Sequence, residues 1–164
     1  MTDGVELVMS LTIDDGVLST SEFKQAAKKA ITNVVPDMQK IMYQVTPVGN
    51  AYDNDKHPGR LRESWVKPVD GLPTYRVTSR KNGDFGVFLY NNAKDQAGRK
   101  YVKWVKNGHE SFNQYGGPFV TYNGTTWVNG KFFIERGTNR IKNDTSITDK
   151  ISVNITKDLN NRGK

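Results

Sequence analysis

The 164-residue sequence predicts an α+β fold, with an antiparallel β-sheet of hairpins packed on a long N-terminal helix and one or more C-terminal helices. Three observations predict it: a capped amphipathic stretch near the N-terminus, strand-forming runs separated by turn residues, and apolar residues spaced by four near the C-terminus. We expect a single domain over residues 1–164. Its loops are expected at about residues 46–59, 91–99 and 110–118, where polar residues and glycines predominate.

The first two predicted elements are a strand and the long helix. Residues 5–13 are β-branched and apolar with partial alternation, which predicts a strand before the turn at residues 14–16. Ser19 and Glu22 then have capping-box spacing. Apolar residues follow at three- and four-residue steps, which predicts a helix with one buried stripe: Phe23, Ala27, Ala30, Ile31, Val34, Met38 and Ile41. Pro36 predicts a kink or a break near Val35.

The sheet is expected from hairpins in the middle of the chain. Residues 60–66 can form a short turn or the entry to a strand. Residues 75–79 and 85–90 flank turn residues 81–84 and predict a hairpin. Residues 119–122 and 125–128 flank Asn123-Gly124, which predicts a second one. Residues 101–105 fit either a strand or a short helix.

The C-terminal part predicts one or two helices. Lys131 to Lys142 reads as a helix with Phe132, Phe133 and Ile141 as inward residues, weakened by Gly137. After it, four apolar residues recur every four positions, which favours a second helix: Ile147, Ile151, Ile155 and Leu159. Alternation over residues 151–155 fits a strand equally well, so both alternatives stay open.

Composition narrows the function classes. The chain has no cysteine, so disulfides and thiolate chemistry are excluded, which suits a reducing cytoplasm. The first residues lack a basic region followed by an apolar run, and no long apolar run occurs, so we expect neither a signal peptide nor contact with a membrane. The net charge is +7: residues 1–82 carry 11 Lys/Arg and 10 Asp/Glu, and residues 83–164 carry 13 and 7. The basic second half favours an acidic partner, either nucleic acid or protein.

Candidate chemical sites are few. Asp53, Asp55 and His57 could converge on a cation, but a solvated loop is the favoured interpretation, and the glycine and glutamate spacing of a calcium loop is missing. His109 and Glu110 could pair a base with a carboxylate, yet no third partner has a recognisable spacing. The segment at residues 83–86 is a hairpin turn rather than a nucleotide-binding loop. We therefore predict no catalytic, metal-binding or cofactor-binding residue, and no enzymatic activity.

A basic aromatic run, Lys100 to Lys106, offers cations for phosphates and rings for stacking. The same spacing of Tyr101, Trp104 and Val105 also makes a core face, with Lys103 and Lys106 as solvated neighbours. Packing is the favoured interpretation, and a basic nucleic-acid-binding module is the alternative function.

Three motifs carry a family resemblance. They occur in order: Thr46-Pro47-Val48 after the helix, His57-Pro58-Gly59-Arg60-Leu61-Arg62-Glu63-Ser64-Trp65 after a loop, and the run from Tyr101 to His109 after two strands. In this order they resemble the head-tail joining, tail-completion or minor capsid proteins of long-tailed phages. Gly130 to Phe133 resembles the start of that family's closing helix. The match covers residues 19–143, and it departs from the family in the long loop between Gly108 and Lys131.

The resemblance implies a structural assembly protein of the virion neck or tail top, made in the host cytoplasm. It implies a ring, a hexamer, that binds portal or connector proteins on one side and tail-tube or tail-terminator proteins on the other. DNA would pass through the lumen and make at most passive contact. Without this context, residues 60–65 are only a basic turn, with Leu61 and Trp65 packed inward and both arginines solvated.

Overall fold

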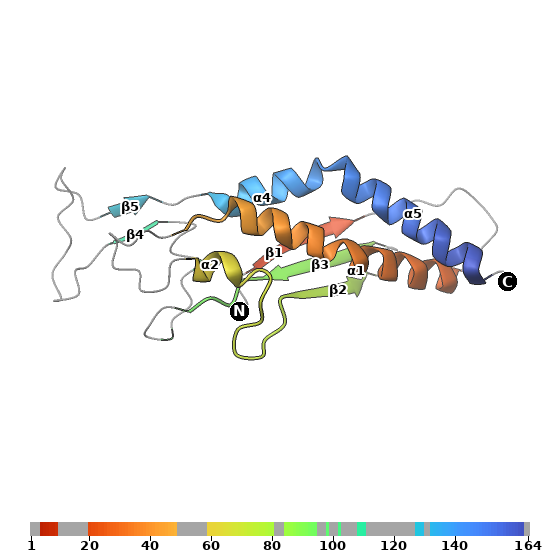
Figure 1. The fold of residues 1–164 in the computed structure, drawn as a ribbon, viewed down its shortest axis with the longest axis horizontal. Coiled ribbons are helices and arrows are strands. Elements are labelled where there is room, and N and C mark those ends of the chain that lie inside the picture. Colours follow the sequence, from red (N-terminus) through yellow and green to blue (C-terminus); the bar gives the residue numbers. More distant parts are fainter. Residues whose placement is uncertain are drawn as a thin grey trace.

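The computed structural model describes residues 4–9, 20–48, 59–80, 84–94, 98, 102, 108–110, 127–129 and 132–162. For residues 20, 108–110 and 127–129 it describes the backbone only. The elements follow one another along the chain as β1 (Gly4–Met9), α1 (Thr20–Val45), α2 (Arg60–Glu63), β2 (Tyr75–Ser79), β3 (Phe85–Tyr90), β4 (Gly108–Glu110), β5 (Trp127–Asn129), α4 (Phe133–Lys142) and α5 (Thr145–Arg162). The predicted α+β single domain is confirmed. Helix α1 runs beside α4 and α5, and the strands of the main sheet lie roughly along the axis of α1 (Figure 1).

Helix α1 supplies much of the core. The predicted stripe is confirmed, since Ala27, Ala30, Ile31, Val34, Met38 and Ile41 are buried and Phe23 packs against them. Of the kink or break predicted near Val35, the break is wrong, because α1 continues through Pro36 to Val45. Pro36 is exposed, and a proline inside a helix costs about 3 kcal/mol. Fully burying Val34, Val35 and Met38 stabilises the same stretch by about 1.5–3 kcal/mol each, which outweighs that cost.

The main sheet has the order β1-β3-β2, with both outer strands antiparallel to β3. The predicted hairpin of β2 and β3 is confirmed, and the backbone N–H of Arg80 donates to the carbonyl of Asp84 at 2.8 Å as the hairpin closes. Val87 pairs with Leu7 on one side and with Val77 on the other. Leu7 and Val87 belong to the core, and Val77 packs against it. Because side chains alternate along a strand, the residues between them lie on the opposite face.

The C-terminal region forms two helices. Phe133 and Ile141 are buried as predicted, but Phe132 precedes α4 and is 65% exposed, so its predicted inward position is wrong. Gly137 does more than weaken α4, because a side chain there would collide with the Met42 sulfur of α1. The absence of a side chain therefore allows close approach of α4 and α1.

The alternative between helix and strand at residues 147–159 is resolved as helix. Ile147, Ile151 and Ile155 are buried and Leu159 packs on the core, whereas Val153 is 64% exposed. A strand would instead have placed Val153 on the same face as Ile151 and Ile155.

The remaining short strands, β4 and β5, pair antiparallel, with Gly108 opposite Asn129. Most of the predicted hairpin around Asn123-Gly124 lies outside the described residues. No helix in the described part of the chain is both long enough and apolar enough to cross a membrane.

Candidate functional site

Most of the candidate side chains predicted from the sequence lie outside the described residues. Asp53, Asp55 and His57 lie outside the described residues, and of the Lys100 to Lys106 run only Val102 is described, where it is buried. His109 and Glu110 lie in β4, which is described by its backbone alone. Among described residues, no three His, Cys, Asp or Glu side chains cluster as metal ligands would.

The Thr46 motif and the Arg60 to Trp65 motif meet in one buried junction. The fully buried indole of Trp65 donates from Nε1 to the Thr46 hydroxyl at 2.8 Å. That hydroxyl donates in turn to the carbonyl of Met42 at 2.6 Å, and the amide of Gln39 donates to the Trp65 carbonyl at 2.7 Å. The end of α1 is thereby joined to the segment that follows α2.

Both arginines of this junction make specific contacts, so the prediction that they are simply solvated is wrong. Arg62 donates from Nε and an Nη to the Thr46 carbonyl, at 3.1 and 2.9 Å, and its guanidinium lies 5.3 Å from the centre of the Tyr43 ring. Arg60 donates to the carbonyl of Lys94 at 2.9 Å. Residues 60–63 form the short helix α2 rather than a strand entry, and this geometry aims the two guanidinium groups at different chain segments.

A third segment enters the junction from the end of β3. The Ser64 hydroxyl lies 2.5 Å from Oδ1 of Asn91, and the amide of Asn91 donates to the Leu61 carbonyl at 2.8 Å. Both side chains are buried, so each hydrogen bond replaces water that these polar groups have lost. Sequence reasoning missed Asn91, which follows the apolar run of β3 directly and was assigned to a loop.

The face of the sheet opposite the core carries a different set of residues. On β3, Phe88 and Tyr90 stack with ring centres 6.4 Å apart, and Phe88 pairs with Glu6 on one side and Arg76 on the other. Glu6 makes an ion pair with Arg80 across the sheet. Val8 is 51% exposed on this face. We call these residues, with Gly4, Gly86 and Thr78, the outer sheet face.

The outer sheet face contains a hollow of about 300 Å³, lined by Gly4, Val5, Glu6, Phe88 and Tyr90, which we call the sheet hollow. Gly4 stands opposite Tyr90 and cannot carry a side chain, because a Cβ there would collide with the carbonyl oxygen of Leu89. Glycine within a strand often marks a place where another group approaches the backbone closely. The alternation of Gly4, Glu6 and Val8 was the available sequence signal for this site.

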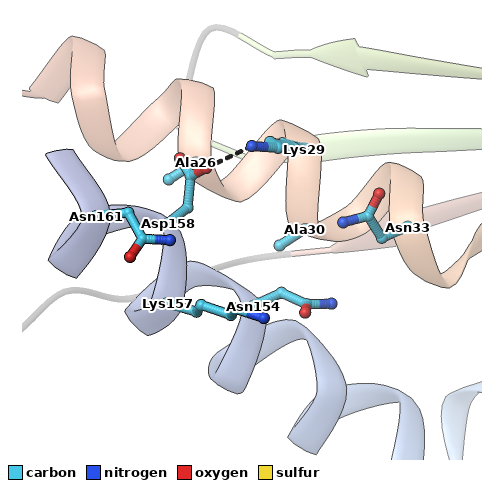
Figure 2. A pocket seen from close by; sticks show the side chains of 8 residues that line it. All are labelled: Ala26, Lys29, Ala30, Asn33, Asn154, Lys157, Asp158 and Asn161. Carbon is cyan, nitrogen blue, oxygen red and sulfur yellow. Dashed lines mark hydrogen bonds and ion pairs between the residues drawn. The ribbon is translucent and has the colours of Figure 1, made fainter.

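A second cleft, of about 210 Å³, lies between α1 and α5 (Figure 2). Polar side chains from both helices line it together with Ala26 and Ala30. Asp158 of α5 accepts a hydrogen bond from Lys29 of α1 at 2.6 Å and pairs with Arg162 at 2.9 Å. The hydrogen bond from Lys29, with help from Arg162, lowers the pKa of Asp158 below its usual 3.8. The Lys29–Asp158 ion pair therefore joins α1 to α5.

Comparison of the chain with protein-family models, with curated proteins and with solved structures gives no significant match. Function is therefore inferred from the sequence motifs and from the positions that their residues take in the fold.

Proposed function

We propose that this chain is a structural assembly subunit of the head-tail joint of a long-tailed phage. It would act as a ring-forming tail-completion or connector protein of the virion neck, without enzymatic activity. Its partners would be further copies of itself in a hexamer, the portal or connector proteins, and the tail-tube or tail-terminator proteins.

The observation that carries this proposal is the junction of Thr46 with Arg62 and Trp65. The residues through which the chain resembles head-tail joining proteins contact one another directly, through a fully buried indole and a doubly donating arginine. That two of the motifs form one structural unit supports the proposal. Of the third motif the structure describes Val102, which is buried, and the backbone of Gly108 and His109 in β4.

The character of the outer sheet face also supports an assembly role. It combines stacked aromatic rings with arginines, residue types that are enriched where proteins bind proteins, and it also carries an exposed valine. A ring requires that one patch of each copy binds a different patch of the next, and exposed apolar groups surrounded by charges suit that purpose.

The decisive experiment removes the gene from its phage and examines the lysate by electron microscopy. We expect full heads and finished tails that remain unjoined, and joining restored by the wild-type gene supplied in trans. A Lys67→Ala variant is the matched control for handling, since Lys67 is exposed and, among the described residues, pairs with the exposed Glu63. Normal joining in the absence of the protein would refute the proposal.

Nucleic-acid binding is tested separately by fluorescence anisotropy with single- and double-stranded DNA at increasing salt. Passive contact in a lumen predicts weak binding that disappears toward physiological ionic strength, because few counterions are released. Tight binding with a steep salt dependence would instead favour the nucleic-acid-binding alternative.

A further inference from the structure

The layer formed by α1, α4 and α5, which we call the helical layer, has an excess of positive charge. Residues 20–45 hold four Lys/Arg and two Asp/Glu, and residues 133–162 hold six and four, which gives a net charge of +4. The strands of the main sheet hold one charge of each sign, Glu6 and Arg76, and have no net charge. The helical layer is therefore the side of the fold that attracts an anionic partner.

The cleft between α1 and α5 lies within this layer, and its lining is rich in hydrogen-bond donors (Figure 2). Asparagines come from both helices, one from α1 and two from α5, and a lysine comes from each. The polar lining residues are Lys29, Asn33, Asn154, Lys157, Asp158 and Asn161. Ammonium and amide groups donate hydrogen bonds, so the lining suits a guest that is rich in acceptor oxygens.

Positive charge in the cleft exceeds what its own carboxylate neutralises. Asp158 is shared by Lys29 and Arg162, so two cations already face this one anion. Lys157 is exposed and has no acidic partner in the described part of the chain. Its side chain extends along α5 toward Asn154 (Figure 2). An anion that enters the cleft therefore meets an uncompensated ammonium group beside an amide.

The lining distinguishes a DNA backbone from an acidic protein segment. Its apolar part consists of Ala26 and Ala30, without an aromatic or a large aliphatic side chain. Protein partners are held mainly by such large buried anchors. Protein–DNA interfaces are more polar and more positively charged, and lysine and asparagine side chains supply many of their contacts to phosphate and sugar. The composition of the cleft therefore fits a phosphodiester backbone better than a polypeptide.

We propose that the cleft between α1 and α5 binds the phosphodiester backbone of double-stranded DNA, so that the helical layer faces the DNA passing through the joint. The inference rests on the function proposed above and names the surface that touches the DNA. Lys157 would contact a phosphate, and Asn154 would donate to a phosphate or sugar oxygen beside it. Contacts of this kind carry no sequence information, which suits a joint through which DNA of every sequence passes.

Fluorescence anisotropy of a labelled double-stranded DNA, titrated with the full chain at increasing salt, tests the contact. Lys157→Gln removes one phosphate contact. The slope of log K against log salt should become shallower by about 0.9, and the affinity at about 50 mM salt should fall about tenfold. Asn154→Asp hardly changes the size of the side chain but repels phosphate, so it should weaken binding comparably. Thermal unfolding of both variants verifies that the subunit remains folded.

Lys67→Gln is the matched control. It lowers the net charge by one, as the two cleft variants do, but Lys67 follows α2 and pairs with Glu63 outside the cleft. It should keep the wild-type slope. Acetylation of lysines with and without DNA, read by mass spectrometry, locates the contact directly. DNA should protect Lys157 and leave Lys67 reactive.

The other outcomes overturn the inference. Absence of DNA affinity at low salt would remove the contact. An equal loss in Lys67→Gln and Lys157→Gln would attribute binding to the overall charge instead of the cleft. Polyglutamate that binds as tightly as DNA, and through Lys157, would assign the cleft to an acidic protein segment. None of these results decides the joining role, which the gene-deletion experiment tests independently.

Discussion

Replacement of Thr46 by valine tests the junction by removing one hydroxyl group. The Thr46 hydroxyl accepts the indole N–H of Trp65 at 2.8 Å and donates to the Met42 carbonyl, and both side chains are fully buried. The Met42 carbonyl keeps a partner in the variant, because the backbone N–H of Thr46 also donates to it at 3.1 Å. The indole N–H is the only group of this set that loses its partner.

The expected loss follows from two opposing terms. A buried donor without an acceptor costs about 1–3 kcal/mol. The methyl group that replaces the hydroxyl stabilises by up to about 0.8 kcal/mol when buried. We therefore expect Thr46→Val to lower the free energy of unfolding by about 1–2 kcal/mol. For a chain of this size, the midpoint of thermal unfolding should fall by about 2–8 °C.

A double-mutant cycle with Trp65→Phe isolates the hydrogen bond. Phenylalanine has no N–H, so Thr46→Val in that background should be neutral or slightly stabilising, although Trp65→Phe itself is costly. Urea unfolding followed by circular dichroism gives the four free energies, provided that the slope with denaturant stays constant. An equal loss in both backgrounds, or no loss in the wild-type background, would show that the Trp65–Thr46 bond does not stabilise the junction.

Three further predictions concern other contacts. Gly137→Ala should lower the free energy of unfolding in urea by about 1–2 kcal/mol, because overpacking against Met42 exceeds the gain in helix propensity. This loss should disappear in a Met42→Ala background. A Gly137→Ala variant that is more stable than wild type would contradict the close packing of α4 on α1. Arg62→Lys should cost about 1 kcal/mol, since lysine cannot donate twice to the Thr46 carbonyl in the same plane, while Lys67→Arg should cost nothing measurable. Asp158→Asn should be less stable than wild type near neutral pH. Because folding lowers the pKa of Asp158, its stabilisation is present above 3.8 and is lost as the pH falls below that value, so the difference should close in acid. A difference that stays constant into acid would disprove the role of this carboxylate.

Periodicity determined most of the fold from the sequence. The three- and four-residue steps in α1 and the turn residues between β2 and β3 are local patterns, and these elements formed where they predicted them. For α5 the sequence left helix and strand open, and the helix was one of the two alternatives. The errors arose where distant contacts outweigh local preference. Burial around Pro36 keeps α1 continuous, and the start of α4 at Phe133 leaves Phe132 exposed.

The site depended on the tertiary structure to a greater degree. The sequence supplied the order of the motifs and predicted that Leu61 and Trp65 are buried, which is confirmed. It did not indicate that Arg62 reaches back sixteen positions to the carbonyl of Thr46, because backbone carbonyls have no sequence signature. Nor did it place Gly4 beside Phe88 and Tyr90, since the register between β1 and β3 is set by which apolar residues face α1. Local patterns thus decided the elements, and the packing of their apolar faces decided which polar groups and aromatic rings meet.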